Sequence, residues 1–275
     1  MSEVRTVAVI GAGTLGRSIA QAAAIGGYRT ILEDILPTAL RKAEDAIRGE
    51  LGRAVEGGMT QQEADAALAR IEFAGNVEEA VRDADMVIES VSDELESKLE
   101  IFVLLDKICR PETIVVCNTH TQSITELSSV IYRAPNCIAM RFPRPPVRSP
   151  LLEIVRGLET TDATVAAAVD VARRMKKEPI VLRETPGAIV ARMQALIANE
   201  AFHMLEEGLA SAEEIDRALQ QGLGLPAGPL AQAEEAGFEL RLRTLEYLHK
   251  TLGERYCPAE VLREWVRENR KAAKE

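Results

Sequence analysis

Three arginines lie close together in the segment CIAMRFPRPPVRSPLLEIV, which spans residues 137–155. Arg141, Arg144 and Arg148 alternate with prolines, and an apolar run stands on either side of them. A guanidinium keeps its proton at physiological pH and offers only donors, in a planar arrangement that matches a carboxylate or a phosphate. The segment therefore predicts either a solvated surface loop or a site for a small anion, in which Arg144 and Arg148 bind substrate.

The composition limits what that anion can be. The chain has 275 residues and a formal net charge of −10, which disfavours nucleic acid and anionic membranes as partners. No apolar run approaches the ~20 residues of a transmembrane helix. The first six residues are too short and polar for a signal peptide, so we expect a cytoplasmic protein that acts on a small molecule. Its four cysteines have no CxxC spacing, and three of them lie in or beside apolar segments, which favours buried thiols over disulfides or a metal site.

A second group of residues suits a cofactor that contains phosphate. Gly11, Gly13 and Gly16 follow the apolar run VAVI and begin a helical pattern. Glycines at these places permit a tight turn, a close approach of backbone to a pyrophosphate, and close packing of helix on strand. Asp34 ends the next β-branched run, where its carboxylate can accept from both ribose hydroxyls and repel a 2′-phosphate. The pattern predicts NAD rather than NADP, and Glu33 is expected to face solvent or to share the ribose contact.

These groups need a scaffold, and the pattern of the chain predicts one. Up to about residue 184, short β-branched runs alternate with helical stretches, as in a parallel sheet covered by helices. The expected strands are 6–10, 30–32, 86–88, 113–117, 137–140, 151–155 and 179–182. Residues 37–70 predict a helical hairpin with a break at Gly57-Gly58 and a cap at Thr60. Only helical patterns follow, so we expect an α/β domain of residues 1–184 and a helical domain of residues 185–275.

Motifs along nearly the whole chain resemble those of the short-chain L-3-hydroxyacyl-CoA dehydrogenases, which include 3-hydroxybutyryl-CoA dehydrogenases. The similar segments are VAVIGAGTLG, EADAALARI, MVIESVSDELESKLEIF, CNTHTQSITEL, LLEIVRG, ETPGAIVAR, EEGLASAEEIDRAL and GLGLPAGPL, in family order. The resemblance implies a Rossmann-type doubly wound sheet with a helical hairpin insertion, followed by an all-α domain through which two subunits form a homodimer. It also implies NAD as cofactor and a 3-hydroxyacyl-CoA substrate in fatty acid metabolism.

The resemblance also assigns an NAD site. The residues expected there are Gly11, Gly13, Thr14, Leu15, Gly16, Asp34, Asp93, Lys98 and Asn118. Lys98 matches a cofactor-contacting lysine of the family, and Asp93 stands where glutamate is usual. Both residues also suit a solvated helix start, because acidic and basic side chains are ordinary there.

The catalytic side departs from the family. At the positions of its histidine base, its orienting glutamate, and the serine and asparagine that hold the substrate oxygen, this chain has Arg141, Glu153, His120 and Ala191. Arg144 replaces a further asparagine near the nicotinamide. A positioned base contributes on the order of 10² to 10⁴ in rate. Arg141 cannot be that base, because a guanidinium does not release its proton.

Two roles are open for Arg141 and two for His120. Arg141 can bind an anion or polarise the reacting oxygen while Glu153 holds it, or form only a structural ion pair with Glu153. His120 follows an apolar run at the sheet edge where ligands bind, and it can serve as an acid/base near neutral pH or only fill space. The sequence predicts a rebuilt proton relay whose catalytic residues are Glu153, Arg141 and His120.

The substrate class has alternatives. The run RPPVRSPLLEIV is also similar to a branch that includes L-gulonate and carnitine dehydrogenases, which act on 3-hydroxy acids without CoA. The hairpin has no lysine in its EGGMTQQEA run, where the family usually binds CoA phosphates, although Arg48 and Arg53 can compensate. The alternatives to an acyl-CoA dehydrogenase are therefore a dehydrogenase of a CoA-free hydroxy acid and a noncatalytic NAD-binding homologue.

Overall fold

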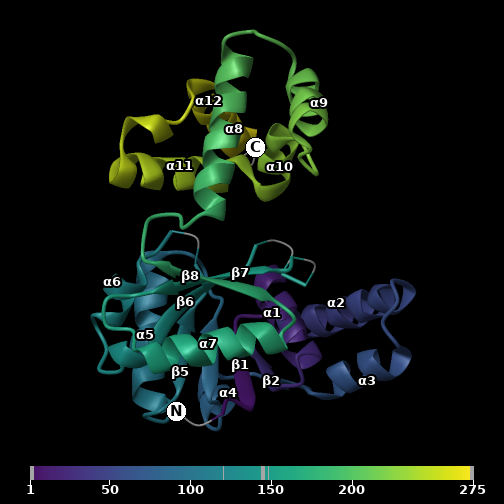
Figure 1. The fold of residues 1–275 in the computed structure, drawn as a ribbon, viewed down its shortest axis with the longest axis vertical. Helices are drawn as coiled ribbons and strands as arrows, with labels where there is room; N and C mark the ends of the chain where they lie inside the picture. Colours follow the sequence, from purple (N-terminus) through teal and green to yellow (C-terminus); the bar gives the residue numbers. More distant parts are fainter. Residues whose placement is uncertain (1–2, 120, 144–145, 148, 273–275) are drawn as a thin grey trace. The chain divides into compact units, whose positions relative to one another are not determined.

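The computed structural model describes residues 3–119, 121–143, 146–147 and 149–272 (Figure 1). The chain divides into two compact units, Met1–Glu184 and Thr185–Glu275. Within the described ranges, none of the helices combines the length and apolar character needed to cross a bilayer.

The first unit is built on one eight-stranded sheet in the order β3-β2-β1-β4-β5-β6-β7-β8. Its strands are β1 (Thr6–Ile10), β2 (Arg29–Glu33), β3 (Ile71–Ala74), β4 (Met86–Glu89), β5 (Ile114–Cys117), β6 (Cys137–Arg141), β7 (Leu151–Arg156) and β8 (Glu178–Arg183). The strand order reverses between β1 and β4, and in such sheets ligands bind beyond the carboxyl ends of the strands at this point. The predicted doubly wound α/β fold is confirmed.

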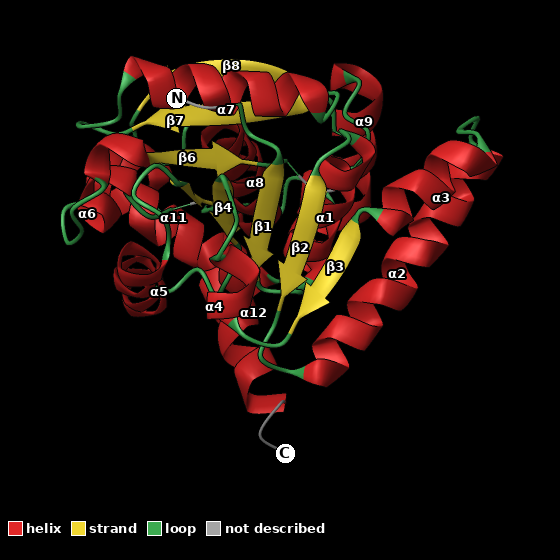
Figure 2. Cartoon of the chain, turned by 90° about the horizontal axis from the view of Figure 1, so that it is seen from below, coloured by secondary structure: helices red, strands yellow, loops and turns green. Residues whose placement is uncertain are grey.

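Helices cover both faces of the sheet, which explains why its central strands are continuous apolar runs. The helices of this unit are α1 (Thr14–Ile25), α2 (Pro37–Glu56), α3 (Gln61–Ala69), α4 (Val77–Val81), α5 (Leu95–Ile108), α6 (Ile124–Ser128) and α7 (Asp162–Arg174). Apolar side chains of α1 and α7 share one core with Val7, Val9 and Leu32. Helices α4, α5 and α6 lie on the other side of the sheet (Figure 2).

The helical hairpin is present as α2 and α3, which lie at the β3 edge of the sheet (Figure 2). Thr60 caps α3 as predicted, since its side chain accepts from the Glu63 N–H while the Glu63 carboxylate accepts from the Thr60 N–H. The structure adds a strand that the sequence pattern missed. β3 is a four-residue edge strand whose Glu72 carboxylate accepts from the Arg29 guanidinium at 2.7 and 2.8 Å. With only four residues, it is too short to give a strand signal.

The strand after the arginine segment runs against its neighbour, which corrects the expectation of a parallel sheet. β6 and β7 are antiparallel, whereas β7 and β8 are again parallel. The reason is the length of the connection, residues 142–150. A parallel crossover needs a dozen or more residues, whereas antiparallel neighbours can be joined by a short loop.

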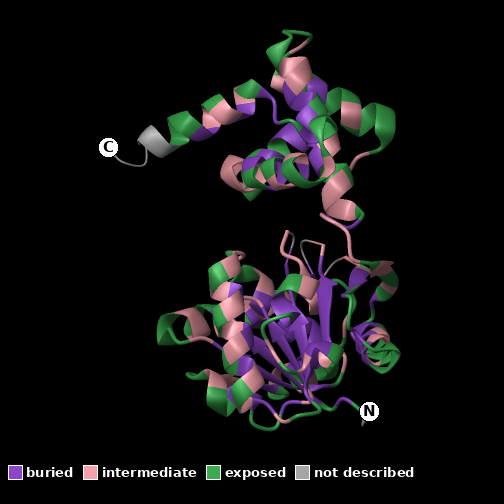
Figure 3. Ribbon diagram, turned by 90° about the vertical axis from the view of Figure 1, so that its left-hand side faces the viewer, coloured by how far each residue is buried: buried purple, intermediate pink, exposed green. Residues whose placement is uncertain are grey.

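The second unit is entirely helical among its described residues. Its elements are α8 (Val190–Glu206), α9 (Ala212–Leu223), α10 (Pro229–Ala236), α11 (Phe238–Leu252), the 3₁₀ turn η2 (Glu254–Tyr256) and α12 (Glu260–Ala272). Trp265 packs against Phe202 and Phe238, with ring centroids 5.7 and 5.0 Å away. Figure 3 shows buried residues inside each unit, so each has its own core.

Candidate functional site

Of the three glycines in the turn after β1, two have no room for a side chain and one does. Gly11 has φ +100° and its N–H donates to the Glu33 carbonyl at 2.8 Å. A Cβ on Gly11 would meet the Ser90 carbonyl oxygen at 2.7 Å, and one on Gly16 would meet the Gly11 carbonyl oxygen at 1.9 Å. A Cβ on Gly13 would meet nothing within 4 Å. The backbone is therefore closely packed at Gly11 and Gly16, where strand and helix meet, and there is free space at Gly13, at the start of the helix.

That opening lies at the first turn of α1. Gly13 is the N-cap and has no side chain to bond the free N–H groups of the helix start. Thr14 and Leu15 are the next two residues, exposed and half-buried respectively. Unpartnered N–H groups and the helix dipole both favour an anion at this place. The geometry thus fits a pyrophosphate.

Asp34 lies directly after β2, beside the glycine turn. One carboxylate oxygen accepts from the Ala12 N–H at 3.0 Å and the other from the Leu36 N–H at 2.9 Å. These bonds fix a half-buried carboxylate next to the opening at Gly13. A fixed negative charge at the end of the second strand suits ribose hydroxyls and opposes a 2′-phosphate.

Glu33, the residue before Asp34, does not face solvent as expected. Its side chain is only 3% exposed and lines a cavity of about 710 Å³ together with Ile35, Asn76 and Arg82. Burial, and to a lesser degree the Asp34 charge, raise the pKa of Glu33 to about 7. The expectation failed because residues of α4 and α5, among them Glu79 and Leu104, surround the same cavity and shield the Glu33 side chain from bulk solvent.

Glu33 should make the stability of the fold depend on pH. A raised carboxyl pKa means that stability is fully present below the unfolded pKa of about 4.5, falls as pH rises to about 7, and then stays level. A shift of this size corresponds to ~3 kcal/mol, which we reduce to about 1 to 2 kcal/mol because the adjoining cavity admits water. Glu33→Gln should therefore unfold at higher denaturant concentration than the wild type at pH 8 and at an equal one at pH 4.5. Glu78→Gln, exposed on the same cavity, is the matched control, and equal effects of both variants would contradict the assignment.

A buried ionic cluster supports the loops after β4 and β5. The Lys98 ammonium donates to both oxygens of Glu89, at 2.8 and 3.0 Å, and to the Asn118 carbonyl at 3.0 Å. Both charged side chains are 0% exposed. Burial raises the pKa of Glu89, and the Lys98 charge opposes this effect.

Because the Lys98 side chain is fully buried, the interpretation of Lys98 as a solvated helix-start residue is wrong. Its contact with the cofactor stays a prediction, and in this structure it holds together two loops at the ligand edge.

Asp93 and Asn118 extend this link between the loops. Asp93 accepts from the Thr119 hydroxyl at 2.6 Å, and its carboxylate lies 3.8 Å from the Lys98 ammonium. The Asn118 side-chain amide donates to the Ser90 hydroxyl at 3.2 Å. Sequence reasoning missed the partners Glu89, Ser90 and Thr119. The available signal for Glu89 was a carboxylate that ends the apolar run MVI.

Arg141 and Glu153 are brought together by strand register. Arg141 ends β6 and stands directly opposite Glu153 of β7, and the side chains of such cross-strand partners lie on one face of the sheet. They are 4% and 3% exposed, so two opposite charges are buried side by side. His120, Arg144 and Arg148, the other residues predicted for substrate and catalysis, lie outside the described residues. Ala191 lies in α8 of the second unit.

Comparison with known proteins gives matches over both units of the chain. The family model for the NAD-binding domain of 3-hydroxyacyl-CoA dehydrogenase matches residues 6–185, and the model for its C-terminal domain matches residues 187–275. A Bacillus subtilis protein named "Probable 3-hydroxybutyryl-CoA dehydrogenase" is 35% identical over 267 residues, which is 96% of this chain and 93% of the relative. An Escherichia coli 3-hydroxyadipyl-CoA dehydrogenase is 36% identical over 238 residues, covering 86% of this chain and 50% of that protein.

Solved structures give the same result. The crystal structure of (S)-3-hydroxybutyryl-CoA dehydrogenase from Ralstonia eutropha has a TM-score of 0.91 and 36% sequence identity, and the match covers 97% of this chain and 95% of that one. Two family models that together span nearly all residues, and a full-length structural match, lead to one conclusion: the chain belongs to the 3-hydroxyacyl-CoA dehydrogenase family.

Proposed function

We propose that this protein is an NAD-dependent dehydrogenase that interconverts a 3-hydroxyacyl-CoA and a 3-oxoacyl-CoA, a reaction of fatty acid metabolism, with a proton relay different from that implied by the family resemblance. The observation that carries the proposal is the glycine turn, which is open only at Gly13, next to the fixed Asp34 carboxylate. A protein that bound no cofactor would not need both a free space at a helix start and a fixed carboxylate beside it. The full-length similarity to proteins named as acyl-CoA dehydrogenases supports the thioester substrate.

The residues of the first unit fit the cofactor. The α1 N-terminus at Gly13 and Thr14 would hold the pyrophosphate, and Asp34 would hold the adenosine ribose. When bound, NAD supplies the hydride acceptor for oxidation of the substrate alcohol. The Lys98 and Asn118 contacts keep the loops after β4 and β5 in place along the same edge.

The proton relay that we propose differs from the one that the family resemblance implies. Glu153 stands opposite the buried Arg141 on the neighbouring strand, where its carboxylate would hold the guanidinium. Arg141 would donate hydrogen bonds to the reacting oxygen or to an anionic group of the substrate. His120 takes the hydroxyl proton on a ring nitrogen during oxidation and returns it during reduction. Arg144 and Arg148 bind the anionic part of the substrate.

Calorimetric titration with NADH tests the cofactor part of the proposal. NADH should bind at least tenfold more tightly than NADPH because Asp34 repels a 2′-phosphate. Gly13→Val should weaken NADH binding at least tenfold, since its side chain fills the opening at the helix start. Gly52→Val in α2, where a Cβ also meets nothing within 4 Å, is the control and should bind as the wild type does. Equal binding by both variants would show that the pyrophosphate lies elsewhere.

We also propose that the protein forms a homodimer through its second unit. Ile189 and Met193 are 48% and 52% exposed at the start of α8, and Leu209 and Leu223 are 69% and 66% exposed in the same unit. Burying such side chains against a second copy removes apolar surface from water. Analytical ultracentrifugation at micromolar concentration should give the mass of two chains, and a monomer mass would refute the dimer.

A further inference from the structure

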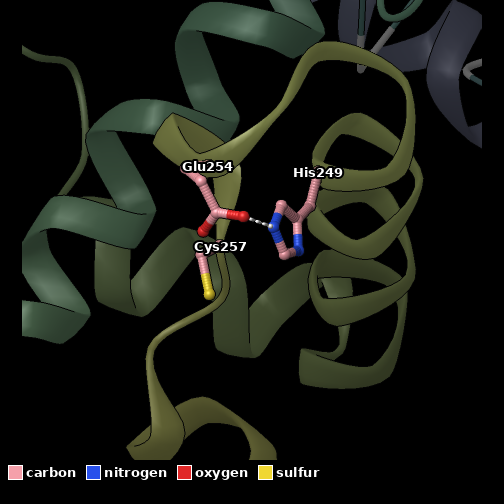
Figure 4. Close-up of side chains that lie close together, drawn as sticks. All are labelled: His249, Glu254 and Cys257. Carbon is pink, nitrogen blue, oxygen red and sulfur yellow. Dashed lines mark hydrogen bonds and ion pairs between the residues drawn. The ribbon is translucent and has the colours of Figure 1, made fainter.

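Three side chains of types that can bind a metal ion lie close together in the second unit, at the end of α11 and in the connection to α12. His249 is in the last turn of α11, Glu254 begins η2, and Cys257 follows η2. Figure 4 shows the three side chains close together, with the Glu254 carboxylate pointing to the His249 ring. Their ligand atoms all lie within 4.8 Å of one another, and the His249 ring nitrogen Nε2 is 3.2 Å from a Glu254 oxygen.

The donor set is the kind that zinc prefers. A nitrogen, a carboxylate oxygen and a sulfur at metal distances of about 2.0 to 2.3 Å suit tetrahedral Zn²⁺, and they leave a fourth position for water. In such a site the ligand atoms stand roughly 3.3 to 3.8 Å apart. The three atoms, at most 4.8 Å apart here, would have to approach one another by about 1 to 1.5 Å to bind one ion. Thiolate and imidazole together select against Mg²⁺ and Ca²⁺, which take oxygen ligands.

The backbone that carries these ligands is fixed by contacts of its own. Gly253 has φ +92°, which turns the chain out of α11, and its N–H donates to the His249 carbonyl at 2.9 Å. The Cys257 N–H donates to the Glu254 carbonyl at 2.8 Å. Tyr256, between the two ligands of the turn, is only 1% exposed and belongs to the core of the unit.

Asn199 of α8 fixes the other side of Cys257. This buried side chain donates to the Cys257 carbonyl at 2.8 Å and accepts from the Ala259 N–H at 3.1 Å. The backbone that carries the three side chains is therefore held in place without an ion, which reduces the conformational entropy that binding must overcome. The ligands themselves are reachable, because Glu254 and Cys257 are exposed and the His249 side chain is 30% exposed.

The simpler alternative is that His249 and Glu254 form only an exposed ion pair, with a cysteine that happens to lie nearby. A similar pair in the same unit allows a comparison: His203 and Glu206 lie 3.4 Å apart. Among the described residues, only His249, Glu254 and Cys257 form a group of three ligands. Cys257 is also the exposed cysteine, whereas Cys109, Cys117 and Cys137 are buried.

We propose that His249, Glu254 and Cys257 bind one Zn²⁺ ion, with water in the open fourth position, and that the ion ties the last turn of α11 to the connection that follows it. One thiolate and one carboxylate balance the charge of the ion. The site lies within the second unit and takes no part in the hydride transfer proposed for the first.

Co²⁺ is the probe for this site, because thiolate ligation gives it an intense charge-transfer absorption that carboxylate and imidazole do not give. The full chain, reduced and freed of metal with a chelator, should bind one Co²⁺ per chain with this band, and Zn²⁺ should displace it. Cys257→Ser should abolish the band, and His249→Gln should weaken binding at least tenfold. Glu206→Gln, which alters the comparison pair and leaves the side chains that contact Asn199 unchanged, should bind as the wild type does.

Thermal unfolding provides a second measurement that does not depend on absorption. Zn²⁺ should raise the Tm of the wild type and of Glu206→Gln, because an ion that binds only the folded state stabilises it. It should leave the Tm of Cys257→Ser unchanged. A wild type without a thiolate band, or a Cys257→Ser variant that still gains stability from Zn²⁺, would overturn the proposal, whatever the outcome for NADH binding and turnover.

Discussion

Replacing His120 by Asn should lower kcat for acetoacetyl-CoA reduction by about 10² to 10⁴, which is the usual contribution of a positioned acid/base. Arg141 cannot compensate, because its guanidinium neither accepts nor readily releases a proton. NADH affinity, measured by calorimetry, should stay within twofold of the wild type, since the glycine turn and Asp34 are untouched. Turnover retained at the wild-type rate would remove His120 from the relay.

Two further variants make the His120 result specific. His203→Asn changes a histidine of the second unit and should leave kcat unchanged. Arg141→Lys keeps the positive charge opposite Glu153 but loses the planar pair of donors. It should raise KM or lower kcat if Arg141 meets the substrate. If Arg141 serves only as the ion-pair partner of Glu153, the variant should alter unfolding and leave both kinetic constants unchanged.

Replacing Lys98 by Met should destabilise the fold by about 3 to 5 kcal/mol, because it leaves the fully buried Glu89 carboxylate without its cation. The Asn118 carbonyl loses a donor at the same time. Chemical denaturation at pH 7 measures the effect. The double variant Lys98→Met/Glu89→Leu should recover most of the loss, since replacing both buried charges by apolar groups is often nearly neutral.

An exposed ion pair provides the control for the Lys98 result. Arg29 and Glu72 make an equally short contact of 2.7 Å on neighbouring strands, but their side chains are 47% and 52% exposed. Arg29→Met should therefore cost no more than about 1 kcal/mol. A similar loss in both single variants, or no recovery in the double variant, would show that burial of Glu89 is not the cause.

The features that sequence predicted well are those that depend on local pattern. The glycine spacing, the β-branched runs and the Thr60 cap each act over a few residues, and all are found in the structure. The meeting of Arg141 and Glu153 depends on strand register. It was inferred from a resemblance, because spacing alone does not reveal which residues of two strands stand opposite.

The features that sequence missed depend on tertiary contacts. β3 is held by pairing with β2 rather than by its own propensity. Glu33 and Lys98 belong to residue types that are usually exposed. Only the packing of helices on the sheet shows that both are buried. The cluster of His249, Glu254 and Cys257 has no familiar ligand spacing, and the turn at Gly253 is what brings the three side chains together.

The central claim is that the protein reduces a 3-oxoacyl thioester although it has Arg141 where the resemblance implies a histidine base. Its most direct test is NADH oxidation with acetoacetyl-CoA, measured beside acetoacetate, which has the same 3-oxoacyl group without CoA. We predict turnover of the thioester at an ordinary enzymatic kcat, on the order of 1 to 10³ s⁻¹, with a kcat/KM at least 100-fold above that of acetoacetate. Tight NADH binding with turnover of the free acid alone, or of neither compound, would contradict the claim.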